Sequence, residues 1–86
     1  MISEELFRNL KKSMEVYKEY LLNPTNHATD EDKRIFGVMM FKYGALLAAK
    51  REYENMSRED KLRVDLIAAD AEAFIETVEE ICVVTN

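Results

Sequence analysis

The chain has 86 residues, of which 48% are hydrophobic and 34% charged, and its formal net charge is −5. This length supports a single domain, 1–86, and the composition is too apolar for a disordered chain and too charged for a membrane protein. A single Cys excludes an internal disulfide. We expect a cytoplasmic protein, because the first residues lack the basic and apolar regions of a signal peptide.

Hydrophobic residues recur at helical spacing in three segments, which predict helices over residues 3–22, 30–54 and 58–83. The first helix begins at Ser3, a preferred N-cap residue. It ends ahead of Pro24, because proline disfavours helical geometry in the residue before it. The second helix is capped by Thr29 or Asp30, and the acidic residues of its first turn match the helix dipole.

A tight break separates the second and third helices. Asn55 suits a left-handed position at the end of the second helix, and Ser57 caps the third. Because short connections make sequential helices antiparallel neighbours, the sequence predicts an all-α, antiparallel three-helix bundle. With the turn centred near residue 56, Lys42 and Asp70 lie equally far on either side of it, and we predict an ion pair between them.

The predicted helix 30–54 is apolar on two opposite sides, whereas a surface helix needs one apolar stripe. One side supplies a bundle core with Ile35, Phe36, Met39, Tyr43, Leu46, Leu47 and Tyr53. The opposite side carries Gly37, Phe41, Gly44, Ala45 and Ala48. The other two helices are expected to follow the one-stripe rule.

Glycine in a helix interior costs roughly 1 kcal/mol relative to alanine, and small residues let another helix approach closely. We therefore predict self-association through the second apolar side of helix 30–54, most simply as a homodimer. Two alternatives remain open. The side is a small exposed strip on a monomer, or the first helix or the tail crosses it.

The negative charge is concentrated at the end of the chain. All 12 basic and 11 of the 17 acidic residues lie in 1–63, and the other six acidic residues lie in 64–86. Four of the six point to the same side of their helix, within about 60° of one another and away from the core: Asp65, Glu72, Glu76 and Glu79. We expect this acidic face to contact a basic protein surface, the alternative being a solvated helix face. The charge opposes direct binding of nucleic acid.

No constellation of residues predicts catalysis, and we expect no catalytic residue, metal or cofactor. The single His, His27, falls in a loop, and Cys82 borders the apolar stripe of its helix, where we expect a buried structural thiol. Glu76-x-x-Glu79 matches half of the acidic pattern of all-α pyrophosphohydrolases. No second acidic pair faces it from the core side of helix 30–54, so the sequence is not assigned to them.

The pattern favours a non-enzymatic interaction or regulatory module, a small acidic homo-oligomer that binds another protein. Such proteins are common among those encoded by phages and mobile elements. One alternative is a small all-α enzyme with a site between subunits, built from Lys42, Lys50 or Tyr43 and acids of the last helix. Another is a structural subunit of a larger assembly. No membrane partner is expected, since the longest apolar-rich stretch, 35–49, is shorter than a ~20-residue span.

Overall fold

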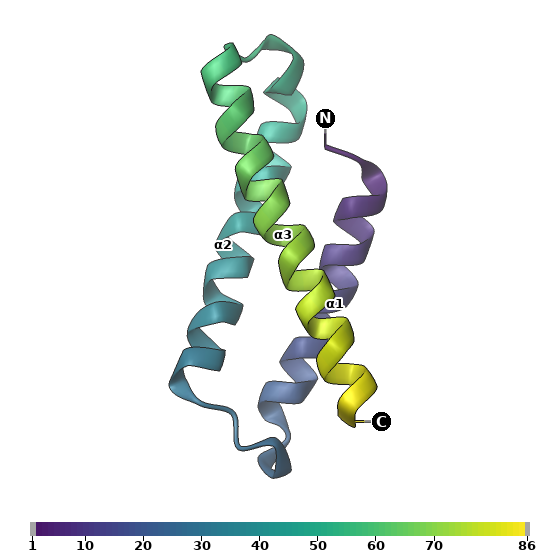
Figure 1. Ribbon diagram of the computed structural model, residues 1–86. Coiled ribbons are helices and arrows are strands. Elements are labelled where there is room, and N and C mark those ends of the chain that lie inside the picture. Colours follow the sequence, from purple (N-terminus) through teal and green to yellow (C-terminus); the bar gives the residue numbers. More distant parts are fainter. Residues whose placement is uncertain (1, 86) are drawn as a thin grey trace.

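The computed structural model describes the backbone of residues 2–85 and the side chains of residues 2–81, and it contains three helices (Figure 1). They are α1 (Glu4–Leu22), α2 (Asp30–Glu52) and α3 (Arg58–Thr85), with short 3-10 turns η1 (Pro24–Asn26) and η2 (Tyr53–Asn55) between them. All three helices pack against one another, and the described residues contain no strand. The predicted all-α three-helix bundle is confirmed. α1 and α3 run in the same direction, and α2 runs opposite to both.

Side-chain caps fix where α1 and α3 begin, as the sequence predicts. The hydroxyl of Ser3 accepts a hydrogen bond from the backbone N–H of Leu6 at 3.1 Å. At the start of α3, the hydroxyl of Ser57 accepts one from the N–H of Asp60 at 3.2 Å. Each cap satisfies one of the backbone donors that a helix leaves unpaired at its N-terminus.

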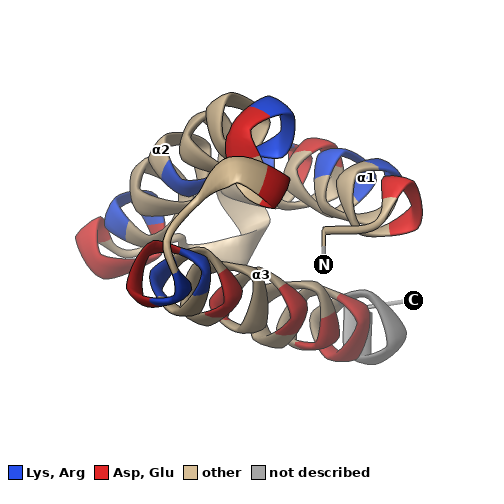
Figure 2. Cartoon of the chain, turned by 90° about the horizontal axis from the view of Figure 1, so that it is seen from above, with Lys and Arg blue, Asp and Glu red and all other residues tan. Residues whose placement is uncertain are grey.

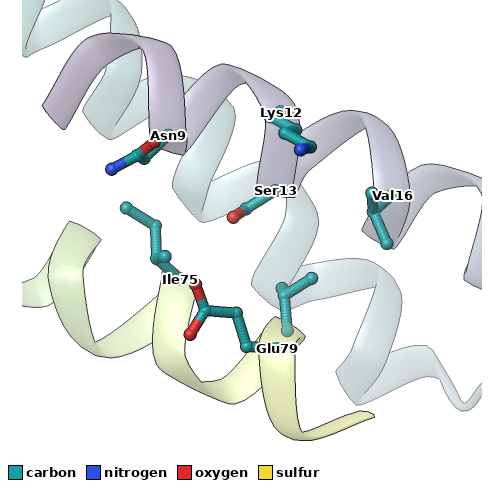
Figure 3. A pocket seen from close by; sticks show the side chains of 7 residues that line it. Asn9, Lys12, Ser13, Val16, Ile75 and Glu79 are labelled. Atoms are coloured by element: carbon teal, nitrogen blue, oxygen red, sulfur yellow. The ribbon is translucent and has the colours of Figure 1, made fainter. Parts of the chain in front are cut away.

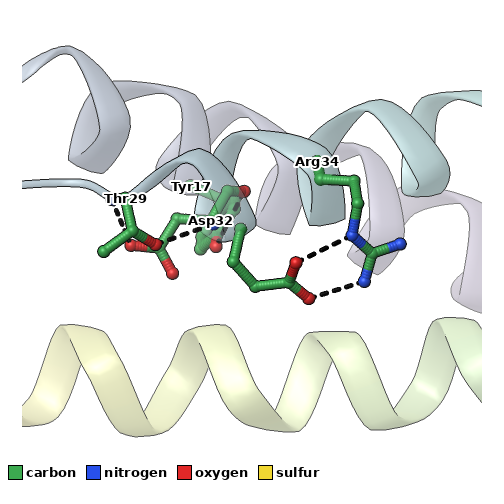
Figure 4. Close-up of polar contacts among 5 residues, drawn as sticks. Tyr17, Thr29, Asp32 and Arg34 are labelled. Carbon is green, nitrogen blue, oxygen red and sulfur yellow. Dashed lines mark hydrogen bonds and ion pairs between the residues drawn. The ribbon is translucent and has the colours of Figure 1, made fainter.

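The start of α2 is held by a capping box (Figure 4). The Thr29 hydroxyl accepts from the Asp32 N–H at 3.1 Å, and the Asp32 carboxylate accepts from the Thr29 N–H at 2.9 Å. One turn on, the Arg34 guanidinium donates to both carboxylate oxygens of Glu31, at 2.8 and 2.6 Å. This hydrogen bonding lowers the pKa of Glu31. Of the two predicted N-cap residues, Thr29 and Asp30, Thr29 is the one that caps α2.

The connection between α2 and α3 differs from the prediction at Asn55. No left-handed residue occurs there, because α2 continues into the right-handed turn η2 and then into extended backbone at Met56. The N–H of Met56 closes this turn on the carbonyl of Tyr53 at 3.1 Å. Among the described non-glycine residues, the one positive φ is at His27, which ends η1 with φ 49°.

The core is one layer of side chains between the three helices. Leu10 of α1 and Leu46 of α2 have no exposed surface and occupy its centre. Around them lie the other buried hydrophobic residues: Leu6, Phe7, Tyr17, Met39, Ala49, Val64, Ala71, Phe74 and Val78. Within each helix the core residues recur at separations of three, four or seven positions, as expected for one face of a helix.

Tyr17 links all three helices at the η1 end of the core. Its ring centroid lies 5.3 Å from that of Phe74 in an edge-to-face arrangement, and 6.4 Å from that of Phe36 in a stacked one. Its hydroxyl donates to the backbone carbonyl of Asp32 at 3.2 Å. Burial raises the pKa of the Tyr17 phenol.

Polar contacts at the edges of the core join the helices in pairs. The predicted ion pair is present, with Lys42 Nζ 2.7 Å from an Asp70 carboxylate oxygen, in agreement with the predicted register of α2 against α3. At the other edge of α2, the ammonium of Lys50 is paired with Glu4 of α1. The same ammonium lies 5.2 Å from the centroid of the Phe7 ring.

The bundle is elongated and has a large surface for its mass. Its extents are 46 × 23 × 15 Å, and its radius of gyration is 14.1 Å against about 12 Å for a compact chain of this length. The accessible surface is 6300 Å², about 1,000 Å² more than that of a typical folded monomer of 10.0 kDa. In the described part of the chain, no helix is both long and apolar enough to cross a membrane.

Candidate interaction surfaces

The side of α2 that faces away from α1 and α3 is open. We call it the α2 outer face, and it consists of Gly37, Phe41, Gly44, Ala45 and Ala48, all exposed except the half-buried Ala45. The Phe41 side chain is 79% exposed. A Cβ built on Gly37 or Gly44 would meet nothing within 4 Å, so no described part of the chain covers the face at these glycines. The alternative that α1 crosses it is therefore wrong.

The exposed apolar surface extends beyond the predicted residues. On α2, Met40 and Leu47 are also exposed. On α3, Leu62 and Leu66 are each 61% exposed, so the expectation of a single apolar stripe on this helix is wrong. With Ala69 and Ala73 they form a second stripe at spacings of four, three and four. At about 100° per residue it lies opposite the buried Val64, and the same arithmetic could have found it in the sequence.

The predicted acidic face is divided between two places. Glu72, Glu76 and Glu79 lie along the half of α3 that runs beside α1, where this helix carries acidic residues and no basic ones (Figure 2). Asp65 lies at the other end of the helix, where its carboxylate accepts a 2.9 Å hydrogen bond from the Tyr53 hydroxyl. That hydrogen bond raises the pKa of Tyr53.

The three glutamates border a groove between α1 and α3 made of two adjoining pockets. The first, about 380 Å³, is lined by Ser3, Glu5, Leu6, Asn9, Glu72, Ile75, Glu76 and Glu79. The second, about 360 Å³, is lined by Asn9, Lys12, Ser13, Val16, Ile75, Val78 and Glu79 (Figure 3). They share Asn9, Ile75 and Glu79, and we call them together the α1/α3 groove. The sequence did not predict the groove, because helical spacing alone does not show which sides of α1 and α3 face each other.

The residues considered for an enzyme site do not form one cluster, although Tyr43 and Lys50 both contact the Phe7 ring. Lys42 is paired with Asp70, and the Tyr43 ring packs edge-on against Phe7 at 6.1 Å between centroids. Lys50, paired with Glu4, lines a hollow of about 700 Å³ whose walls come from a single turn of α2. Of the two pockets of the groove and this hollow, none is lined by more than one of the three side chains.

The described part of the chain also holds no group of three or more His, Cys, Asp or Glu side chains arranged to bind a metal ion. His27 is exposed in the loop, as predicted. The prediction for the Cys82 thiol falls outside the described side chains.

Comparison of the chain with protein-family models, with curated proteins and with solved structures finds no match.

Proposed function

We propose that this protein is a non-enzymatic protein-interaction module that forms a homodimer through the α2 outer face and in that form engages another protein. One observation carries the proposal. Phe41 is 79% exposed in the middle of the α2 outer face, and no atom lies within 4 Å of a Cβ built on either glycine of that face. Burying a phenylalanine side chain stabilises by roughly 1.5–3 kcal/mol. A second copy of the chain supplies that burial.

The glycines support the same conclusion. Gly37 and Gly44 flank Phe41 at separations of four and three residues, so all three lie on one side of the helix. Without a Cβ, each leaves room for the aromatic ring of a partner helix. In a twofold dimer the contact is self-complementary, so Phe41 of each subunit meets the small residues of the other.

The surface area and the charge also favour a second copy. The excess of about 1,000 Å² over a compact monomer is close to the roughly 800 Å² that each partner contributes to a standard interface. Lys42 is the one charged residue between 37 and 49, and Asp70 of the same chain pairs with it. Two acidic chains can therefore meet through this face without placing their carboxylates against one another.

The test is the mass in solution over a range of concentrations, by sedimentation equilibrium or light scattering. We expect about 20 kDa for the wild type, twice the 10.0 kDa of the chain, and 10.0 kDa for Phe41→Glu. Leu22→Glu is the matched control, because Leu22 is 71% exposed at the end of α1, away from the α2 outer face. It should leave the mass unchanged.

Circular dichroism establishes that both variants remain helical. A wild-type mass of 10.0 kDa up to millimolar concentration would contradict the proposal. Equal dissociation by Phe41→Glu and Leu22→Glu would contradict the assignment of the face.

A further inference from the structure

Apart from Tyr17, Ser13 is the one buried residue of the described chain that carries a polar side-chain group, and 7% of its surface is exposed. No other described residue forms a hydrogen bond with its hydroxyl. No fully buried side-chain nitrogen or oxygen of the described chain lacks a hydrogen-bond partner, so the Ser13 hydroxyl keeps a solvent-accessible surface in the pocket. Figure 3 shows the hydroxyl directed from α1 into the space between α1 and α3, where it lines the second pocket of the groove. A hydrogen-bonding group from outside the chain can reach the hydroxyl through this pocket.

The surroundings of Ser13 define the charge that such a group should carry. The groove is bordered by four carboxylates, those of Glu5, Glu72, Glu76 and Glu79, and by one cation, Lys12. In the described part of the chain, none of these five groups takes part in an ion pair. The Glu79 carboxylate also points into the space between the helices (Figure 3). The groove is therefore complementary to a positive charge.

The floor of the groove is apolar. It is formed by Leu6 and Val16 of α1 and by Ile75 and Val78 of α3. A ligand that combines an aliphatic stem with a cationic end matches both the floor and the walls. Arginine meets this description, and its planar group of five N–H donors can bond a hydroxyl and a carboxylate at the same time.

We propose that the α1/α3 groove binds an arginine-bearing extended segment of a partner protein. The guanidinium lies between Glu79 and the Ser13 hydroxyl, and the stem lies on Ile75 and Val78. This inference rests on the proposed function in one respect, that the protein acts by binding another protein. The pocket volume of about 360 Å³ is in the range that encloses a small ligand or one large side chain.

The spacing of the carboxylates sets the pattern of the segment. Glu79 lies about 7.5 Å along the axis of α3 from the midpoint between Glu72 and Glu76, from the rise of 1.5 Å per residue. Alternate side chains of an extended chain are about 6.6 Å apart. A segment with the pattern Arg-x-Arg can therefore place one guanidinium at Glu79 and Ser13 and the next beside Glu76 and Glu72.

The experiment is an NMR titration of the isotope-labelled protein with the peptide Gly-Ser-Arg-Leu-Arg-Ser-Gly, blocked at both ends. We expect shifts concentrated in residues 5–16 and 72–79, and none with a peptide in which citrulline replaces both arginines. Citrulline keeps the shape of arginine and removes its charge. Equal binding of the two peptides would overturn the proposal, as would shifts centred on the α2 outer face.

Variants of the protein locate the site. Glu79→Gln should weaken binding by about two- to fivefold, the range for an exposed ion pair. Glu80→Gln is the matched control, because it removes the same charge from the neighbouring position, which does not line the groove. Equal effects of the two variants would show non-specific attraction and overturn the proposal.

Two further variants separate charge from hydrogen bonding. Lys12→Ala removes the competing cation and should tighten binding. Ser13→Ala leaves the charge unchanged and should weaken it, and no change with Ser13→Ala would overturn the role of the hydroxyl. The titration is repeated with Phe41→Glu. If the monomeric variant still binds the peptide in the groove, the two proposals are independent. Failure of the dimer proposal can then be told apart from failure of the groove proposal.

Discussion

The ammonium of Lys42 lies 2.7 Å from a carboxylate oxygen of Asp70, and the two residues are 28 positions apart in the sequence. The two side chains are 26% and 57% exposed, so water screens much of their attraction. We expect Lys42→Ala and Asp70→Ala each to lower the free energy of unfolding by less than about 1 kcal/mol, with a coupling of about 0.2–1 kcal/mol in a double-mutant cycle. Urea unfolding measures both.

The exchanged pair, Lys42→Asp with Asp70→Lys, is the control. It should recover most of the stability that either charge reversal alone removes. If the effects of the two alanine substitutions on the free energy of unfolding simply added, the ion pair would not stabilise the packing of α2 against α3.

The glycines of the α2 outer face predict opposite effects on folding and on association. Nothing lies within 4 Å of the Cβ that alanine would add at Gly37 or Gly44, and neither has a positive φ. In a Phe41→Glu background, each Gly→Ala change should therefore raise the free energy of unfolding by about 0.5–1 kcal/mol. In the wild type the same changes should weaken dimerisation, measured by sedimentation. Unaltered dimerisation would mean that the partner helix does not approach closely at the glycines.

Tyr17→Phe tests the buried hydroxyl. The substitution removes the hydrogen bond to the Asp32 carbonyl and should lower the free energy of unfolding by about 0.5–1.5 kcal/mol at neutral pH. Phenylalanine keeps the ring contacts with Phe36 and Phe74, so circular dichroism should be unchanged.

Tyr17 also predicts a dependence on alkaline pH. Its pKa is raised in the folded state, so the folded protein holds this proton more tightly than the unfolded chain. The resulting stability is complete below the unfolded pKa of about 10 and is lost as the pH rises through the folded pKa. The wild type should lose stability more steeply than Tyr17→Phe above pH ~10. Parallel pH curves for the two proteins would contradict this assignment.

Thr29→Ala tests the capping box of α2. The change removes the side-chain acceptor for the Asp32 N–H, and we expect a loss of about 0.5–2 kcal/mol in the free energy of unfolding. Thr77→Ala is the control, since the exposed Thr77 hydroxyl bonds only a carbonyl of its own helix, that of Ala73. It should change stability by no more than about 0.5 kcal/mol. A similar loss in both variants would show that the box adds nothing to an ordinary threonine.

The helix boundaries could be predicted because they are local. Ser3, Thr29 and Ser57 cap the helices through contacts only three residues away, and Pro24 restricts its immediate neighbour. Asn55 shows the limit of this reasoning. Asparagine tolerates a left-handed conformation without requiring it, and the chain turns through a right-handed η2 instead.

The candidate surfaces were partly predictable for a different reason. The α2 outer face follows from helical spacing alone, which is why its exposure agrees with the sequence. The groove does not follow, because three antiparallel helices can be arranged in two mirror-related orders around their core. Only the observed order brings Glu72, Glu76 and Glu79 beside α1 and leaves Asp65 with Tyr53.

The groove lies between the first and the last helix of the chain, α1 and α3. Asn9 of α1 and Ile75 of α3 line the same pocket although 66 positions separate them in the sequence. By contrast, α2 is connected to each of its neighbours by a short turn. Contacts between such distant segments require the closure of a long loop, so the α1/α3 contact should be the last to form in folding and the first to open. A ligand in the groove would bind only the folded state, in which α1 and α3 are in contact. By mass action it would stabilise that contact. Its binding should therefore raise the melting temperature and slow amide hydrogen exchange throughout α1.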